Sequence, residues 1–220
     1  MDAPGAVFLI VGDVLRWIGF ALSPLLLLPL STLIAPGLVG GVSGRVADGL
    51  NRITGMALKL AMATVVLMAL AQLTVVVIRQ VFGLAFSWLD ETVVYAFAAT
   101  FLLAAAGALR DDAHVRVDIL RPRFTPQTRA AIELVGSYLF IFPIGVLVLW
   151  AVEPSLARSW AGLEGSRESD GLPIYFLLRT LMPVFAVLLI LQGVSNALTA
   201  ALGLRGLREL DDGERKASVG

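Results

Sequence analysis

The stretch that decides the fold runs from residue 92 to residue 109 and reads TVVYAFAATFLLAAAGAL. It holds no charged residue, whereas Asp90 and Glu91 precede it and Arg110 follows it. An uncharged apolar run of this length, with charges at both ends, is typical of a helix that crosses roughly 30 Å of hydrocarbon. Acidic residues at the start of such a helix and a basic residue at its end also suit the helix dipole.

The rest of the chain repeats this pattern, with further uncharged runs at residues 17–44, 60–78, 134–149 and 180–204. Of the 220 residues, 58% are hydrophobic and only 15% are charged, against roughly 25% charged residues in a soluble domain. The mean hydropathy is +0.85. This composition excludes a soluble enzyme, a disordered chain and a nucleic-acid-binding domain. It also excludes a β-barrel, whose strands alternate and lack long apolar runs.

We therefore predict an all-α integral membrane protein, a four-transmembrane-helix bundle with spans at residues 56–78, 92–109, 130–152 and 173–204. Residues 6–36 are apolar but contain Pro24, Pro29 and Pro36, so we expect an additional N-terminal membrane helix or an interfacial segment. The start of the chain lacks the basic region of a secretory signal, so we expect insertion without a cleaved leader. Residues 37–55 are rich in glycine and carry charges, and we interpret them as a linker that leaves the membrane.

This interpretation divides the chain into three parts. Residues 1–49 form the N-terminal hydrophobic segment and linker, residues 50–204 form the four-span membrane domain, and residues 205–220 form a mobile cytoplasmic tail. Five arginines lie in the 110–129 loop, none lies in the 80–91 loop and two lie in the 153–172 loop. Because cytoplasmic loops are enriched in Lys and Arg, we expect the 110–129 loop and the C-terminus to be cytoplasmic in a bacterial inner membrane.

Few residues of this sequence could act in catalysis or proton transfer. His114 is the single histidine, and Arg110, His114 and Asp118 follow one another at four-residue steps, which places them on one face of a helix. They could form a proton relay or a His–Asp pair, or a structural stripe of hydrogen bonds. No nucleophile motif, phosphate-binding loop or metal-ligand cluster is present. We therefore predict no catalytic, cofactor-binding or metal-binding residue and no cofactor.

The predicted spans instead carry features of helix–helix contact. Small residues recur at four-residue spacing at Ala96, Thr100, Ala104 and Ala108, and again at Gly193, Ala197 and Ala201. Polar side chains within the spans could form interhelical hydrogen bonds or, equally well, line a substrate path: Gln72, Thr74, Ser137, Gln192, Ser195 and Asn196. The internal repeat of a complete secondary transporter is missing. These features indicate an accessory subunit.

Two segments carry a family resemblance. Residues 88–97 read WLDETVVYAF, and residues 109–120 read LRDDAHVRVDIL. Together they resemble the DctQ-like small membrane subunit of TRAP (tripartite ATP-independent periplasmic) transporters. The family pattern is an acidic residue opening the second span, an aromatic residue one turn later, an arginine at the end, and then His-hydrophobic-x-hydrophobic-Asp. The residues that fill these places are Glu91, Tyr95, Arg110, His114, Val115, Val117 and Asp118.

The resemblance covers about residues 50–204 and implies a small permease subunit of a sodium-driven uptake system for organic acids. Its implied role is to support a large membrane subunit and to help dock a periplasmic substrate-binding protein. The partners are then these two proteins and the lipid bilayer, and no nucleic acid. Glu164 and Glu168, in an external loop, are the residues we expect at a docking rim. Two alternatives remain at this point: a membrane enzyme using His114 and Asp118, or a stand-alone small transporter acting as an oligomer.

Overall fold

The computed structural model describes residues 3–111 and 124–209, with the side chains described from residue 9 onward. All regular elements in these residues are helices, and they are α1 (Ala3–Ile34), α2 (Pro36–Phe82), α3 (Ser87–Arg110), α4 (Pro126–Gly136), η2 (Ser137–Ile141), α5 (Phe142–Ala161) and α6 (Tyr175–Leu204). Five stretches of the described residues are long and apolar enough to cross a membrane, with α4, η2 and α5 together forming one of them. The predicted fold class is confirmed, and the apolar N-terminal segment is one of the five helices.

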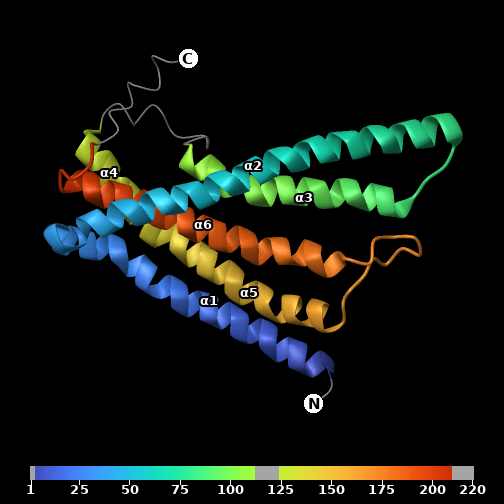
Figure 1. Ribbon diagram of the computed structural model, residues 1–220, viewed down its shortest axis with the longest axis horizontal. Helices are drawn as coiled ribbons and strands as arrows, with labels where there is room; N and C mark the ends of the chain where they lie inside the picture. The colour runs from blue at the N-terminus through green and yellow to red at the C-terminus, as the bar shows by residue number, and fades with distance from the viewer. Residues whose placement is uncertain (1–2, 112–123, 210–220) are drawn as a thin grey trace.

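The helices form an antiparallel bundle in which α6 is central (Figure 1). α6 contacts α1, α2, α3, α4 and α5. α2 and α3 run side by side as a hairpin that separates from α6 toward residues 83–86, while α1, α5 and α6 lie together (Figure 1). The loop from residue 162 to 174 lies at the same end as residues 83–86, and the end of α6 lies at the opposite end (Figure 1).

The main departure from the sequence prediction is α2. Its 47 residues give a length of about 70 Å, more than twice the hydrocarbon thickness. Residues 37–55 were expected to form a separate linker, but they are helical and continue directly into the first predicted span. The physical reason lies in the buried face of this segment, where small or apolar residues recur every three or four positions: Gly40, Ser43, Ala47, Leu50 and Thr54. Packing of this face offsets the helix propensity lost at glycine, roughly 1 kcal/mol for each glycine compared with alanine.

The N-terminal half of α2 packs across the C-terminal half of α6. A Cβ added to Gly40 would lie 2.7 Å from the side chain of Leu207 and 3.9 Å from that of Leu202, so these leucine side chains pack directly on the glycine. Where α1 turns into α2, the buried hydroxyls of Thr32 and Ser43 share a 2.7 Å hydrogen bond. The fold thus joins α1 to α2 at one end of the bundle and holds α2 against α6.

Pro143 lies at the start of α5, two residues after the end of the π-helical turn η2. A proline interrupts the helical hydrogen-bond ladder because it has no N–H. Here the N–H of Phe142 donates to the carbonyl of Ser137, five residues back. The helix therefore continues from α4 into α5 through one wide turn.

Candidate functional site

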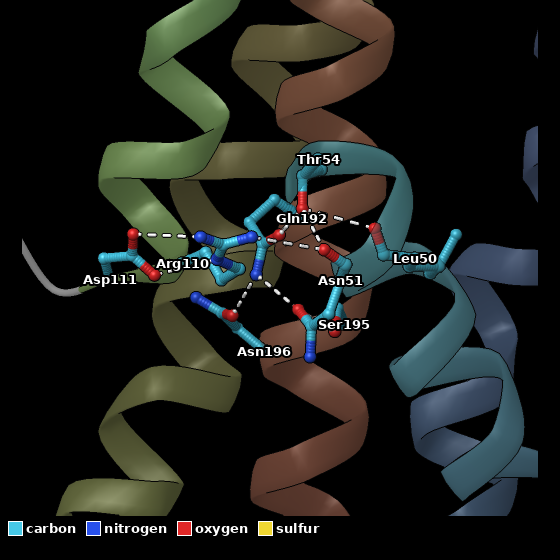
Figure 2. A network of polar contacts seen from close by, with 8 residues as sticks. All are labelled: Leu50, Asn51, Thr54, Arg110, Asp111, Gln192, Ser195 and Asn196. Carbon is cyan, nitrogen blue, oxygen red and sulfur yellow. Dashed lines mark hydrogen bonds and ion pairs between the residues drawn. The ribbon is translucent and has the colours of Figure 1, made fainter. Parts of the chain in front are cut away.

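A buried polar network joins α2, α3 and α6 (Figure 2). Its centre is Gln192 of α6, whose side chain is completely buried. The Gln192 amide oxygen accepts from the Thr54 hydroxyl at 2.6 Å, and its nitrogen donates to Asn51 Oδ1 at 3.1 Å and Asn196 Oδ1 at 2.8 Å. Both amide protons and the amide oxygen of Gln192 are therefore satisfied by neighbouring side chains.

Asn51 extends the network along α2. Its side-chain oxygen also lies 2.9 Å from the hydroxyl of Ser195, which is 3.0 Å from the Ala47 carbonyl oxygen. Arg110, at the end of α3, reaches the Asn51 carbonyl oxygen at 3.4 Å and binds the Asp111 carboxylate at 2.8 and 3.0 Å (Figure 2). Three helices are thus joined at one level of the bundle.

The hydrogen bonds of this network hold α2, α3 and α6 in position, and most of its polar side-chain groups are used in these bonds. Interhelical hydrogen bonds in membrane proteins contribute about 0.6 kcal/mol each on average, and up to about 1.7 kcal/mol. Because buried amides that lose their partners are costly, this arrangement favours one crossing of α2 over α6. Of the polar residues expected to form interhelical hydrogen bonds, Gln192 and Ser195 do so. The hydroxyls of Thr74 and Ser137 instead donate to backbone carbonyls four residues earlier, at 2.8 and 2.9 Å. The bond of Asn196 runs within α6 to Gln192.

Small residues allow this close packing. Gly193, Ala197 and Ala201 are all buried within the bundle. A Cβ at Gly193 would lie 2.7 Å from Ile141 of η2. On α3, Ala96 is buried and the hydroxyl of Thr100 bonds that of Thr64 at 2.9 Å. The α6 ridge, and the described contacts of the α3 ridge, are therefore made inside this chain.

The opposite end of α3 is tied to the loop between α5 and α6. Glu91 accepts from the Ser166 hydroxyl with one carboxylate oxygen and from the Leu172 backbone N–H, at 2.7 Å, with the other. Glu91 thus fastens the 162–174 loop to α3. Glu91 fills the acidic position of the family pattern, but that pattern does not predict its hydrogen bonds to Ser166 and Leu172.

Two further contacts stabilise the same end. Arg79, near the end of α2, forms a 2.8 Å ion pair with Asp90, although both side chains are about half exposed. Hydrogen bonds from the Ser87 side chain and from its backbone N–H, the latter at 3.0 Å, lower the pKa of the Asp170 carboxyl below its usual value. The loop is thereby attached at Ser87 as well as at Glu91.

The two predicted docking acids differ in their surroundings. Glu164 forms a 3.1 Å ion pair with Arg179 of α6, which also donates to the Ser155 hydroxyl. Glu168 is exposed, and its backbone N–H donates to the Ser166 hydroxyl at 3.0 Å. Glu164 therefore contributes to the internal structure of the loop end, whereas the side chain of Glu168 is presented to the surroundings.

The other residues of the family pattern lie at different places along the chain. Tyr95 lies one turn after Glu91 with a buried hydroxyl that finds no hydrogen-bond partner among the described residues. His114 and Asp118 lie outside the described residues. Arg110 therefore joins the network of Gln192, while Glu91 and Tyr95 lie toward the other end of α3.

Asn51 is the central residue that sequence reasoning missed. It lies in the segment interpreted as a linker, so no role was considered for it. The signal was nevertheless present, because Ala47, Leu50 and Thr54 follow a helical period into the first predicted span. Within residues 3–111 and 124–209, no three His, Cys, Asp or Glu side chains group as a metal site would require.

The sequence and structure were compared with protein-family models, with curated proteins and with solved structures. A family model described as "Tripartite ATP-independent periplasmic transporters, DctQ component" matches residues 68–203, more than half of the chain. No curated protein and no solved structure matches the chain significantly.

Proposed function

The chain belongs to the DctQ family, the small membrane component of tripartite ATP-independent periplasmic transporters, and from this premise we propose that it is a scaffold that supports the large membrane component. The family consists of transporter components and not of enzymes, so the alternative of a membrane enzyme is set aside. The chain is a multi-pass membrane component of such a system.

The observation that carries the scaffold proposal is how the buried polar groups are used. Gln192 donates both amide protons to Asn51 and Asn196 and accepts from Thr54 with its oxygen, so both of its amide protons are engaged within the bundle. A cavity of about 610 Å³ between α1, α5 and α6 is lined almost entirely by apolar side chains. Transport pathways are typically marked by ionisable residues that face the bundle interior. The chemistry of this bundle is that of a rigid support.

Co-purification tests this proposal. The chain and the large membrane component of its own system are expressed together, with an affinity tag on the chain alone. We expect a stable complex after extraction in mild detergent. The Gln192→Leu variant should recover less of the large component, whereas Gln72→Leu, a change at an exposed position of α2, should recover the wild-type amount. Recovery of no large component with the folded wild-type chain would contradict the proposal.

We further propose that the loop end of the bundle helps to dock the periplasmic binding component. Glu168 supports this because its side chain is exposed. Charges at the rim of an interface chiefly change the association rate and its salt dependence. Glu168→Lys should therefore slow docking at low salt, with Glu168→Gln intermediate, and the difference should shrink above the ionic strength at which surface charges are screened. Equal association rates for all three proteins would exclude this role.

The orientation proposed for the chain places the 110–129 loop and the C-terminus in the cytoplasm. It rests on the arginines of that loop. A reporter fused after Arg123 should be active as a cytoplasmic type, and periplasmic phosphatase activity there would contradict this topology. In the same loop we propose a structural role for His114, so His114→Gln should keep most uptake activity in the assembled transporter. Complete loss of uptake with the complex intact would instead favour a proton relay.

The transported substrate and coupling ion are proposed from the family resemblance. We propose sodium-coupled uptake of an organic acid, with the substrate and ion sites in the large component and Glu91, Tyr95 and Arg110 serving structural roles here. The test is uptake of the acid bound by the periplasmic component, measured in proteoliposomes with an inward sodium gradient and with potassium in its place. Uptake that is equal in both gradients would exclude sodium coupling.

A further inference from the structure

A polar pocket of about 400 Å³ lies where the end of α5, the start of α6 and the 162–174 loop meet. The residues that line it are Ser155, Arg158, Ser159, Gly162, Glu164 and Arg179. It is separate from the Gln192 network, which lies farther along α6. From the composition of this lining, we propose that the pocket binds a carboxylate group.

The side chains that line the pocket carry a net positive charge. Arg179 is already neutralised by Glu164 of the same chain, through an ion pair of 3.1 Å. Arg158 is exposed at the pocket, and no residue in the described part of the chain pairs with its guanidinium. Two arginines against one glutamate leave one positive charge, which matches a singly charged carboxylate better than a doubly charged phosphate.

The pocket is also lined by a buried serine hydroxyl that lacks a hydrogen-bond partner among the described residues. Ser159 is only 2% exposed, and its oxygen has no hydrogen-bond partner among the described residues. A buried hydroxyl without a partner is costly, about 1–3 kcal/mol, unless a ligand supplies one. The Ser155 hydroxyl accepts from Arg179 and so retains its own proton for donation.

The pocket lining offers more hydrogen-bond donors than free acceptors. Arg158, Ser155 and Ser159 all offer protons, while Glu164, the acceptor in the lining, is engaged by Arg179. A group that only accepts hydrogen bonds complements such a pocket, and an ionised carboxylate is such a group. An arginine can bind it through two parallel hydrogen bonds. The carboxylate could belong to a free organic acid or to an acidic side chain of the periplasmic component, and the latter source rests on the proposed function.

The test uses sodium acetate as the probe for a free carboxylate. Thermal unfolding of the complex with the large component is followed as acetate replaces chloride at constant sodium concentration. In wild type and in Arg167→Gln, an exposed loop arginine outside the pocket, acetate should raise the unfolding temperature. For Arg158→Gln, the acetate concentration needed for the same rise in unfolding temperature should be at least about tenfold higher, because hydrogen bonds to charged groups are among the strongest. Ser159→Ala should weaken the response while leaving the unfolding temperature in chloride unchanged, because its hydroxyl has no partner in the described chain.

The second arm tests a carboxylate carried by a protein. If acetate shifts none of the proteins, the dissociation constant of the periplasmic component should rise about tenfold in Arg158→Gln and should also rise in Ser159→Ala, but not in Arg167→Gln. This result would assign the pocket to an acidic side chain. The proposal is overturned if neither acetate nor the periplasmic component distinguishes Arg158→Gln and Ser159→Ala from Arg167→Gln. Failure of the scaffold proposal would appear separately, as absence of a complex with the large component, and the acetate arm can then be run on the chain alone.

Discussion

Replacing Gln192 by leucine removes the centre of the polar network while nearly keeping the side-chain volume. The substitution deletes two interhelical hydrogen bonds, one with Thr54 at 2.6 Å and one with Asn51 at 3.1 Å. With about 0.6 kcal/mol for an average interhelical bond and about 1.7 kcal/mol for the strongest, the loss should be about 1–3 kcal/mol. The new side chain is apolar and remains buried, so little of this loss should come from a cavity.

The assay is reversible unfolding in mixed detergent micelles, followed by helical circular dichroism as the fraction of denaturing detergent rises. The control is Gln72→Leu, the same substitution at an exposed position of α2, which should change the free energy of unfolding by less than about 0.5 kcal/mol. A double-mutant cycle with Asn51→Leu should give a coupling energy of about 0.6 kcal/mol or more. Equal unfolding free energies for Gln192→Leu and Gln72→Leu would show that the Gln192 network does not stabilise the bundle.

The other predictions concern packing and the loop. Gly193→Ala should lower the free energy of unfolding by about 1–3 kcal/mol, because its Cβ would lie 2.7 Å from a neighbouring side chain, whereas Gly41→Ala, with no atom within 4 Å, should be neutral or stabilising in the same assay. Glu91→Ala should accelerate hydrogen exchange at the Leu172 amide, which donates to it, and unchanged exchange would contradict the tether. Asp170 is stabilised as a carboxylate in the folded protein, so its contribution is present above its unfolded pKa and is lost as the pH falls through its lower folded pKa. The amide that donates to Asp170 should therefore titrate with a midpoint below 3.8, and a midpoint at or above this value would contradict the hydrogen bond.

Charge placement predicted the spans because charged residues are costly in hydrocarbon and so mark where helices leave it. The same reasoning failed for residues 37–55, since the glycines and charges there suggested a linker. That segment is helical because one face packs against α6, and its period of buried residues was visible in the sequence. Its charged residues Arg45, Asp48 and Arg52 lie on the exposed face of the same helix.

The sequence predicted which residues of the candidate site form hydrogen bonds, but it did not predict their partners. The sequence predicted structural hydrogen bonds for Gln192 and Ser195, yet their shared partner Asn51 depends on how α2 crosses α6, which no local pattern specifies. Glu91 was selected by its place in the family pattern, whereas its bond to Leu172 depends on the path of an irregular loop. Glu164 was expected at a docking rim, and its ion pair with Arg179 follows only from the folded geometry of that loop.

We propose that this chain supports the large membrane component and does not itself carry the substrate across the membrane. The most direct measurement is uptake of the radiolabelled acid bound by the periplasmic component, into proteoliposomes with an inward sodium gradient. The liposomes contain this chain alone, the large component alone, or both, with the periplasmic component added outside. We expect no uptake by this chain alone and the greatest uptake when both membrane components are present. Sodium-dependent uptake by this chain alone would exclude a purely supporting role and would favour a stand-alone oligomeric transporter.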